Sequence, residues 1–241
     1  MSQRKPSPQN DPRDPAWRPP LDRSLPWPPE GAVDHPNLKE LLYANLTEGQ
    51  TVVDVGCGTG PFVYEDFAPR FIAFDMFEPD NRDGLKAGRD EFRLGKLDAF
   101  PIEDASVDAV VLGFILEHVE KPEAFLREAE RVLKPGGWCY VAIPNGYSLE
   151  DRLFRLATKV AGSQRGPHIQ RFSFDSFRAL AEENTGLRFQ AWHLLRASWM
   201  WMAHPKLRWA RGPWLGLLRA AGVVGVDGFA GANFQVLLKK N

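Results

Sequence analysis

The chain of 241 residues is 44% hydrophobic and 25% charged, which is typical of a globular protein with a sizeable core. Thirty lysines and arginines against 31 aspartates and glutamates leave a formal net charge of -1, which excludes a strong general attraction to nucleic acid. Two cysteines are too few for a disulfide framework, and we find neither an apolar run of roughly 20 residues nor a signal-peptide pattern, so we expect a cytoplasmic protein.

Residues 1–30 are expected to form a proline-rich, flexible tail in front of one domain over residues 31–241. The tail holds nine of the 20 prolines, and proline disrupts both helices and sheet ladders. Its two tryptophans, Trp17 and Trp27, are candidates for docking the tail onto the domain.

From about residue 36 the sequence alternates between amphipathic helices and apolar strands. We expect strands at 51–55, 70–75, 92–98, 107–114, 138–143, 187–195 and 233–238, and helices at 38–46, 122–133, 149–160 and 174–184. Strands that are apolar almost throughout and are separated by helices form parallel sheets covered on both faces. The pattern therefore predicts an α/β fold built on a parallel sheet.

The most informative stretch is the glycine-rich turn that follows the first of these strands, Val52–Gly60. Glycines let the backbone turn sharply and approach a ligand closely, and the amides that follow are expected to open a helix N-terminus suited to an anionic group. The spacing is G-x-G-x-G, whereas the dinucleotide fingerprint is G-x-G-x-x-G. Asp75 ends the next strand, 15 residues after Gly60, where a carboxylate can accept both hydroxyls of a ribose.

The chain resembles the class I S-adenosylmethionine-dependent methyltransferases, specifically their small-molecule, type 11-like branch. The resemblance covers about residues 38–184 and depends on several motifs in order: 53–60, 74–75, 97–101 with 106–110, 116–119 and 131–137. It implies a Rossmann-like, doubly wound sheet of about seven strands, mostly parallel with an antiparallel last strand. It also implies S-adenosylmethionine as the cofactor. Only Pro61–Pro69 separates Gly60 from the second strand, which is short for the first helix of this family.

The same resemblance implies a set of cofactor-binding residues. The glycine loop holds the methionine moiety, Asp75 binds the ribose, and Asp98 contacts the adenine amino group. The full implied set is Asp54, Gly56, Cys57, Gly58, Gly60, Asp75, Met76, Asp98, Ala99 and Phe114.

Methyl transfer from a sulfonium is an in-line displacement that needs no metal, and its rate gain can come mostly from positioning and the exclusion of water. A hydroxyl acceptor also needs a general base near neutrality, which suits histidine. The candidates are His118, just after the fourth strand, and His168, in a loop between two helices. The alternatives are a capping role for His118 and a solvated loop position for His168. His35, His193 and His204 do not cluster at ligand spacing, so we expect no metal site.

Residues 186–226 carry a charge of +6 without one Asp or Glu, together with five of the eight tryptophans. An overlapping stretch, at about 196–230, is interpreted as an insertion before the last strand. Trp with Arg is typical of a surface at the lipid headgroup boundary, and it also suits a lid over an apolar substrate. Packing of these tryptophans on the core is the plainer alternative.

The sequence therefore favours a methyltransferase for a small-molecule or lipid-like acceptor, with peripheral membrane contact through 186–226 and no nucleic-acid partner. A motif for methylating the amino groups of bases is absent, because the fourth strand ends Leu112-Gly113-Phe114. One alternative is a non-catalytic cofactor-binding or scaffold module of the same fold. A nicotinamide-dependent oxidoreductase is a further alternative, although its glycine spacing is missing.

Overall fold

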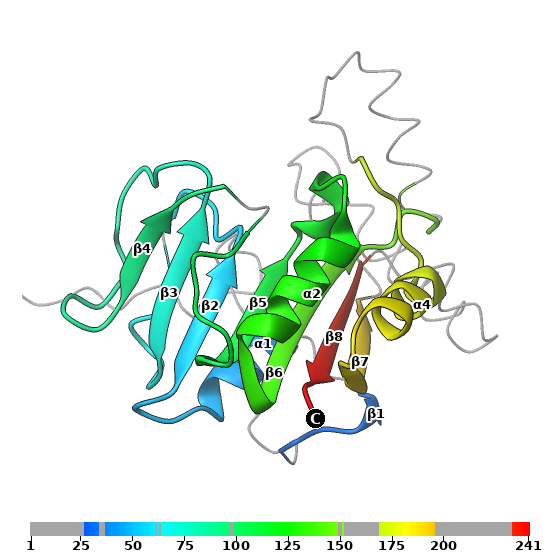
Figure 1. Ribbon diagram of the computed structural model, residues 1–241, viewed down its shortest axis with the longest axis horizontal. Coiled ribbons are helices and arrows are strands. Elements are labelled where there is room, and N and C mark those ends of the chain that lie inside the picture. Colours follow the sequence, from blue (N-terminus) through cyan, green and yellow to red (C-terminus); the bar gives the residue numbers. More distant parts are fainter. Residues whose placement is uncertain are drawn as a thin grey trace, which may run out of the picture.

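The protein folds around one eight-stranded sheet, which forms the centre of the molecule (Figure 1). The computed structural model describes residues 27–33, 37–60, 62, 64–96, 99–148, 151, 169–195 and 233–241. The strands are β1 (Gly31–Ala32), β2 (Thr51–Val55), β3 (Arg70–Asp75), β4 (Glu91–Leu94), β5 (Val107–Gly113), β6 (Leu133–Pro144), β7 (Arg188–Leu195) and β8 (Asn233–Lys239). Their order across the sheet is β1-β7-β8-β6-β5-β2-β3-β4.

The sheet is parallel except at β8, which runs antiparallel to both of its neighbours, β6 and β7. This arrangement confirms the predicted doubly wound sheet with an antiparallel last strand. The chain leaves β2 toward β3 and β4 on one side and returns to β5 and β6 on the other. The strand order therefore reverses between β2 and β5, and ligands of such sheets bind beyond the carboxyl ends of the strands at this point.

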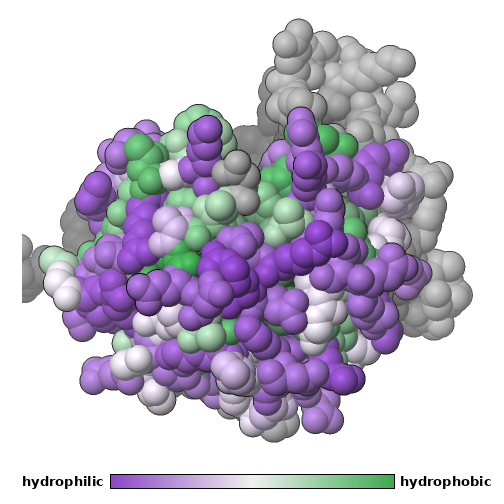
Figure 2. Space-filling model, viewed as in Figure 1, coloured by the Kyte–Doolittle hydropathy of each residue, from purple (hydrophilic) through white to green (hydrophobic). Residues whose placement is uncertain are grey.

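Helices cover both faces of the sheet. The helices α2 (Pro122–Val132) and α4 (Phe174–Asn184) lie on the face turned toward the viewer in Figure 1. Their apolar side chains join those of the strands in one buried cluster, whereas α1 (Leu38–Ala44) packs into a second cluster formed by the alternate strand residues. On the molecular surface seen in the same view, polar residues cover most of the described area and apolar patches lie between them (Figure 2).

The ends of the helices follow from local chemistry. Ser173 and Ser176 form a reciprocal capping box at the start of α4, and Pro122 occupies the first turn of α2, where its missing N–H is not needed. The predicted helix at 174–184 is therefore confirmed at both ends.

Some strand boundaries differ from the predicted ones. β4 ends at Leu94 rather than extending to Asp98, which lies outside the described residues. β6 starts at Leu133 instead of residue 138, because Leu133 already pairs with Val107 before the register shifts toward Ala109. β1 was not predicted, and it pairs with Ala191 and Trp192 of β7.

The prediction of a helix N-terminus after the glycine loop is wrong for the described part of that connection. Residue 62 and residues 64–69 form turns and irregular backbone between β2 and β3. Nine residues that begin and end with proline leave little room for a helix that must also return to the start of β3. Tyr64 instead covers the sheet, with its ring stacked on that of Phe71 at 4.3 Å.

Several predictions fall on residues that the structure does not describe. These include most of the proline-rich tail, the helix at 149–160 apart from Asp151, and the insertion at 196–230. Trp27 is described, and its ring lies 5.0 Å from that of Trp138, as expected for a docked tryptophan. Trp17 lies outside the described residues.

Candidate cofactor site

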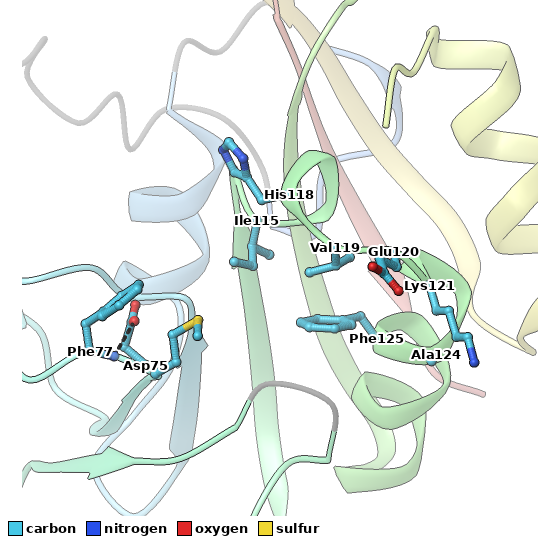
Figure 3. A pocket seen from close by; sticks show the side chains of 10 residues that line it. Asp75, Phe77, Ile115, His118, Val119, Glu120, Lys121, Ala124 and Phe125 are labelled. Carbon is cyan, nitrogen blue, oxygen red and sulfur yellow. Dashed lines mark hydrogen bonds between the residues drawn. The ribbon is translucent and has the colours of Figure 1, made fainter. Parts of the chain in front are cut away.

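A cavity of about 730 Å³ opens at the carboxyl ends of β3 and β5. Asp75 and Phe77 lie on one side of it, and Ile115, Val119 and Phe125 face them from the other (Figure 3). The lining residues are Asp75, Met76, Phe77, Ile115, His118, Val119, Glu120, Lys121, Ala124 and Phe125. The cavity therefore lies where a doubly wound sheet places its ligand, and its volume is that of a small-molecule site.

Asp75, the last residue of β3, is the carboxylate at the edge of this cavity. It is only 6% exposed. Its Oδ2 accepts the N–H of Gly58 at 2.8 Å, and its Oδ1 accepts the N–H of Phe77 at 3.1 Å. A carboxylate has about four acceptor positions, so both oxygens keep the capacity to accept a hydroxyl from a ligand.

The glycine loop adopts backbone conformations that favour glycine. Gly56, Gly58 and Gly60 have φ values of 70°, 76° and 86°. A Cβ on Gly56 would lie 2.8 Å from Cδ1 of Ile115, whereas a Cβ on Gly58 would meet no atom within 4 Å. At Gly56 the loop is therefore packed against the turn after β5. At Gly58, whose N–H is hydrogen-bonded to Asp75, there is free space beside the backbone.

Asp54 lies in β2, just before the glycine loop, and is not among the residues that line the cavity. Its Oδ2 accepts the hydroxyls of Tyr64 at 2.8 Å and of Tyr43 at 3.3 Å. Burial raises the pKa of Asp54, and burial next to Asp54 raises the pKa of both tyrosines. Tyr64, from the connection that lacks a helix, thus anchors that connection to β2.

The other predicted cofactor residues differ in whether they line the cavity. Met76 lines it, whereas Cys57, Ala99 and Phe114 are not among its lining residues. Burial, with the nearby carboxylates of Asp54 and Asp75, raises the pKa of the Cys57 thiol, so the thiol stays neutral. Asp98 lies outside the described residues.

His118 lines the cavity, and Glu117, its neighbour in the chain, is a buried carboxylate that is not among the lining residues. Both belong to the short 3-10 helix η1 (Leu116–His118) that follows β5. The Oε1 atom of Glu117 lies 3.9 Å from Nε2 of His118. His168 lies outside the described residues, so its place relative to the cavity stays a prediction.

The lining also includes residues that sequence analysis did not single out, notably Ile115, Val119 and Phe125. The signal that could have found them is that Ile115 and Val119 lie in the connection between β5 and α2, and Phe125 in the first turns of α2, beside the switch point. Within the described ranges, no group of three or more His, Cys, Asp or Glu residues could hold a metal ion. No helix in the same ranges is long and apolar enough to cross a membrane.

The chemistry of the cavity fits a nucleoside with a charged tail. Asp75 offers acceptors for a ribose, the apolar side chains of Met76, Ile115 and Val119 offer walls for a flat base, and the glycine loop is tied directly to Asp75.

Comparison with known proteins finds a family model and several relatives that match this chain. Residues 53–141 match the family model described as "Methyltransferase domain". The malonyl-(acyl-carrier protein) O-methyltransferase of Hahella chejuensis is 29% identical over 164 residues, which cover 62% of this chain and 55% of that protein. The demethylmenaquinone methyltransferase of Renibacterium salmoninarum is 38% identical over 97 residues, which cover 39% of this chain and 41% of that protein. The chain thus spans about half the length of the curated relatives it matches.

Solved structures share the fold at low sequence identity. Phosphoethanolamine N-methyltransferase 2 of Haemonchus contortus, in complex with S-adenosyl-L-methionine, has a TM-score of 0.58 at 14% identity and covers 85% of this chain and 52% of its own. The (4+2)-cyclase SpnF has a TM-score of 0.58 at 20% identity, with coverage of 85% and 80%. Because a cyclase also has this fold, the fold alone does not decide the reaction, and the family match is the stronger finding. Over residues 53–141 the chain therefore resembles the S-adenosylmethionine-dependent methyltransferases of the type 11 branch, and the rest of the chain shares their fold.

Proposed function

We propose that this chain transfers a methyl group from S-adenosylmethionine to a small-molecule or lipid-like acceptor. The observation that carries the proposal is the Asp75 carboxylate, which lines the cavity and is bonded to Gly58 of the glycine loop. When bound, the cofactor supplies an electrophilic methyl group on a sulfonium. The protein's task is then to hold donor and acceptor in line and to exclude water.

In this proposal Asp75 accepts the ribose hydroxyls, and Asp98 and Ala99 contact the adenine. Met76 packs against the base, while the glycine loop from Gly56 to Gly60 takes the methionine end. Asp54 supports the loop from beneath through Tyr64, and its place in the cofactor set is indirect.

Exposed apolar side chains beyond the carboxyl ends of β5 and β6 support an apolar acceptor. Phe114, Tyr147 and Ile169 are 45%, 48% and 52% exposed. Phe114 has a φ of 57°, a strained conformation for an aromatic residue, and such strain is typical of functional positions. The Arg171 guanidinium lies 4.8 Å from the centre of the Tyr147 ring and is paired with the Asp151 carboxylate at 3.5 Å.

The names of the relatives agree with this acceptor class, since they mention a malonyl group on a carrier protein and a quinone precursor. Residues 186–226, with their arginines and tryptophans, are proposed to contact anionic lipid or a lipid-like acceptor. His118 is proposed as the base when the acceptor is a hydroxyl, with His168 as the second candidate.

The test is incubation of the purified protein with a metabolite extract and S-adenosylmethionine labelled in the methyl group. Label in an extractable small molecule supports the proposal, and mass analysis of that product identifies the acceptor atom. Cofactor binding without label transfer to any component would favour the scaffold alternative. Reduction of a nicotinamide cofactor by the same extract would favour the oxidoreductase.

A further inference from the structure

Glu117 is a buried carboxylate in the turn that carries two lining residues of the candidate cofactor cavity. It is 2% exposed and lies between Ile115 and His118, both of which line the cavity. Its main-chain carbonyl accepts the N–H of Ile169 at 2.8 Å and of Gln170 at 3.1 Å. These two bonds hold the turn against the segment at 169–172.

The carboxylate has few compensating contacts: a hydrogen bond with its own backbone lowers its pKa, but by less than burial raises it. Its Oε2 is buried and has no hydrogen-bond partner among the described residues, and its Oε1 is 3.9 Å from Nε2 of His118, longer than a hydrogen bond. Burial raises the pKa of Glu117 to about 7. A buried carboxylate with one unpartnered oxygen favours its neutral form, so Glu117 carries a proton in mildly acidic solution.

Other charged groups near Glu117 come from three parts of the site. Asp75, at the end of β3, and Glu120 and Lys121, before α2, line the same cavity as His118. Arg171, in the segment packed on the turn, donates a hydrogen bond to the carbonyl of Gly146 and lies over Tyr147. Arg171 is thus engaged by Gly146 and Tyr147, and a new positive charge would enter through the cavity that Ile115 and His118 line on either side of Glu117 in the chain.

We propose that Glu117 is the residue that responds to the charge of the methyl donor: it keeps its proton when the cavity is empty or holds the neutral product, and it releases the proton when the sulfonium binds. The inference rests on the cofactor site proposed above. S-adenosylmethionine and S-adenosylhomocysteine share the same base, ribose, amino group and carboxylate, and they differ by a sulfonium against a neutral thioether. Any difference in proton release between them therefore reports the charge at sulfur and not the titration of the shared groups.

An opposite charge close to a carboxyl group favours its ionised form by roughly tenfold or more. With a tenfold effect, the donor should release about half a proton more than the product at pH 6.5. The affinity ratio of donor to product should then rise by up to about tenfold, or about 1.4 kcal/mol, between pH 5.5 and pH 8. Glu117 would thus discriminate donor from product and favour their exchange after transfer.

The experiment is calorimetric titration of both ligands at pH 6.5 in two buffers with different ionisation enthalpies, which counts the protons released. Wild type should release more protons with S-adenosylmethionine than with S-adenosylhomocysteine, and Glu117→Gln should remove the difference while still binding both. The matched controls are His118→Asn and Glu120→Gln, which should retain it. A thermal melt of each variant confirms that it is folded.

Equal proton counts for the two ligands in wild type would overturn the inference, as would a difference that survives in Glu117→Gln. Loss of the difference in His118→Asn alone would assign the proton to His118 and also overturn it. Failure of wild type to bind either ligand is a separate result, because it would refute the cofactor site and not the role of Glu117. If Glu117→Gln does not fold, Glu117→Asp replaces it and should change the size of the difference.

Discussion

Ile115 occupies the space beside Gly56, so that a Cβ on this glycine would lie 2.8 Å from Cδ1 of Ile115. Gly56 directly follows β2, and Ile115 comes two residues after β5. The two turns at the switch point of the sheet are therefore packed together without a gap. This contact fixes the glycine loop relative to the turn that carries His118.

We expect Gly56→Ala to destabilise the protein more than Gly58→Ala. Both glycines have positive φ, which costs about 1–2 kcal/mol for alanine, but only Gly56 adds a clash, worth about 1–3 kcal/mol more. Urea unfolding measures both. Removal of the clash in Gly56→Ala/Ile115→Ala should recover part of the loss, and equal destabilisation by the two single changes would contradict the packing argument.

The sequence was sufficient to predict β2 and β3 to the residue, because each is a short apolar run bounded by polar residues and ending at the cofactor site. The helix α4 was equally predictable, since its capping serine lies next to it in the chain. β1 had no such local signal: it is two residues long and exists because β7, far along the chain, pairs with it.

The candidate site could also be predicted only in part, because some of its features are local in the sequence and others depend on distant residues. Asp75 stands out in sequence because a strand end and a glycine loop are both visible there. Glu117 belongs to the 116–119 motif in sequence, but its burial and the two bonds from Ile169 and Gln170 to its carbonyl, about 50 residues later, need the fold. That the described residues 62 and 64–69 form no helix could be suspected from nine residues with two prolines, but the Tyr64–Asp54 bond needs the fold.

The stability of the protein should depend on pH through Glu117. Its pKa is raised from an ordinary 4.5 to about 7 in the folded state, so below pH 4.5 both states hold the proton and the group has no effect. As the pH rises from 4.5 to 7, the unfolded state ionises first, and the folded state loses about 3 kcal/mol relative to it. Glu117→Gln should remove this loss, so the variant should gain stability over wild type at pH 8 more than at pH 5. Chemical unfolding at both pH values is the measurement, and parallel pH profiles for the two proteins would rule the effect out.

His118→Asn should leave measurable methyl transfer to the acceptor found by labelling. In-line displacement depends mainly on positioning, and general-base assistance adds about 10²–10⁴-fold. We expect the rate to fall by no more than about 10²-fold with cofactor affinity unchanged. A fall near 10⁴-fold at intact affinity would instead make His118 an essential base.

Residues 186–226 should bind anionic vesicles at low salt and release them at high salt, because their net charge is +6. Co-sedimentation with phosphatidylserine-containing vesicles, compared with phosphatidylcholine alone, tests this. Arg208→Ala/Arg211→Ala should weaken the binding by about 2 kcal/mol, or roughly 30-fold. Protein that stays in the supernatant with anionic vesicles at low salt would exclude membrane contact and favour a lid or core packing.

The most direct measurement is calorimetric titration of wild type and Asp75→Ala with S-adenosylmethionine, S-adenosylhomocysteine and NAD. The account predicts that wild type binds the first two and not NAD. Loss of the Asp75 carboxylate should weaken binding by about 1.5–3 kcal/mol, or roughly 10- to 150-fold, while Glu78→Ala, an exposed carboxylate three residues later, should leave it unchanged. Equal affinity in wild type and Asp75→Ala would contradict the ribose assignment, and wild-type binding of NAD alone would contradict the cofactor site as a whole.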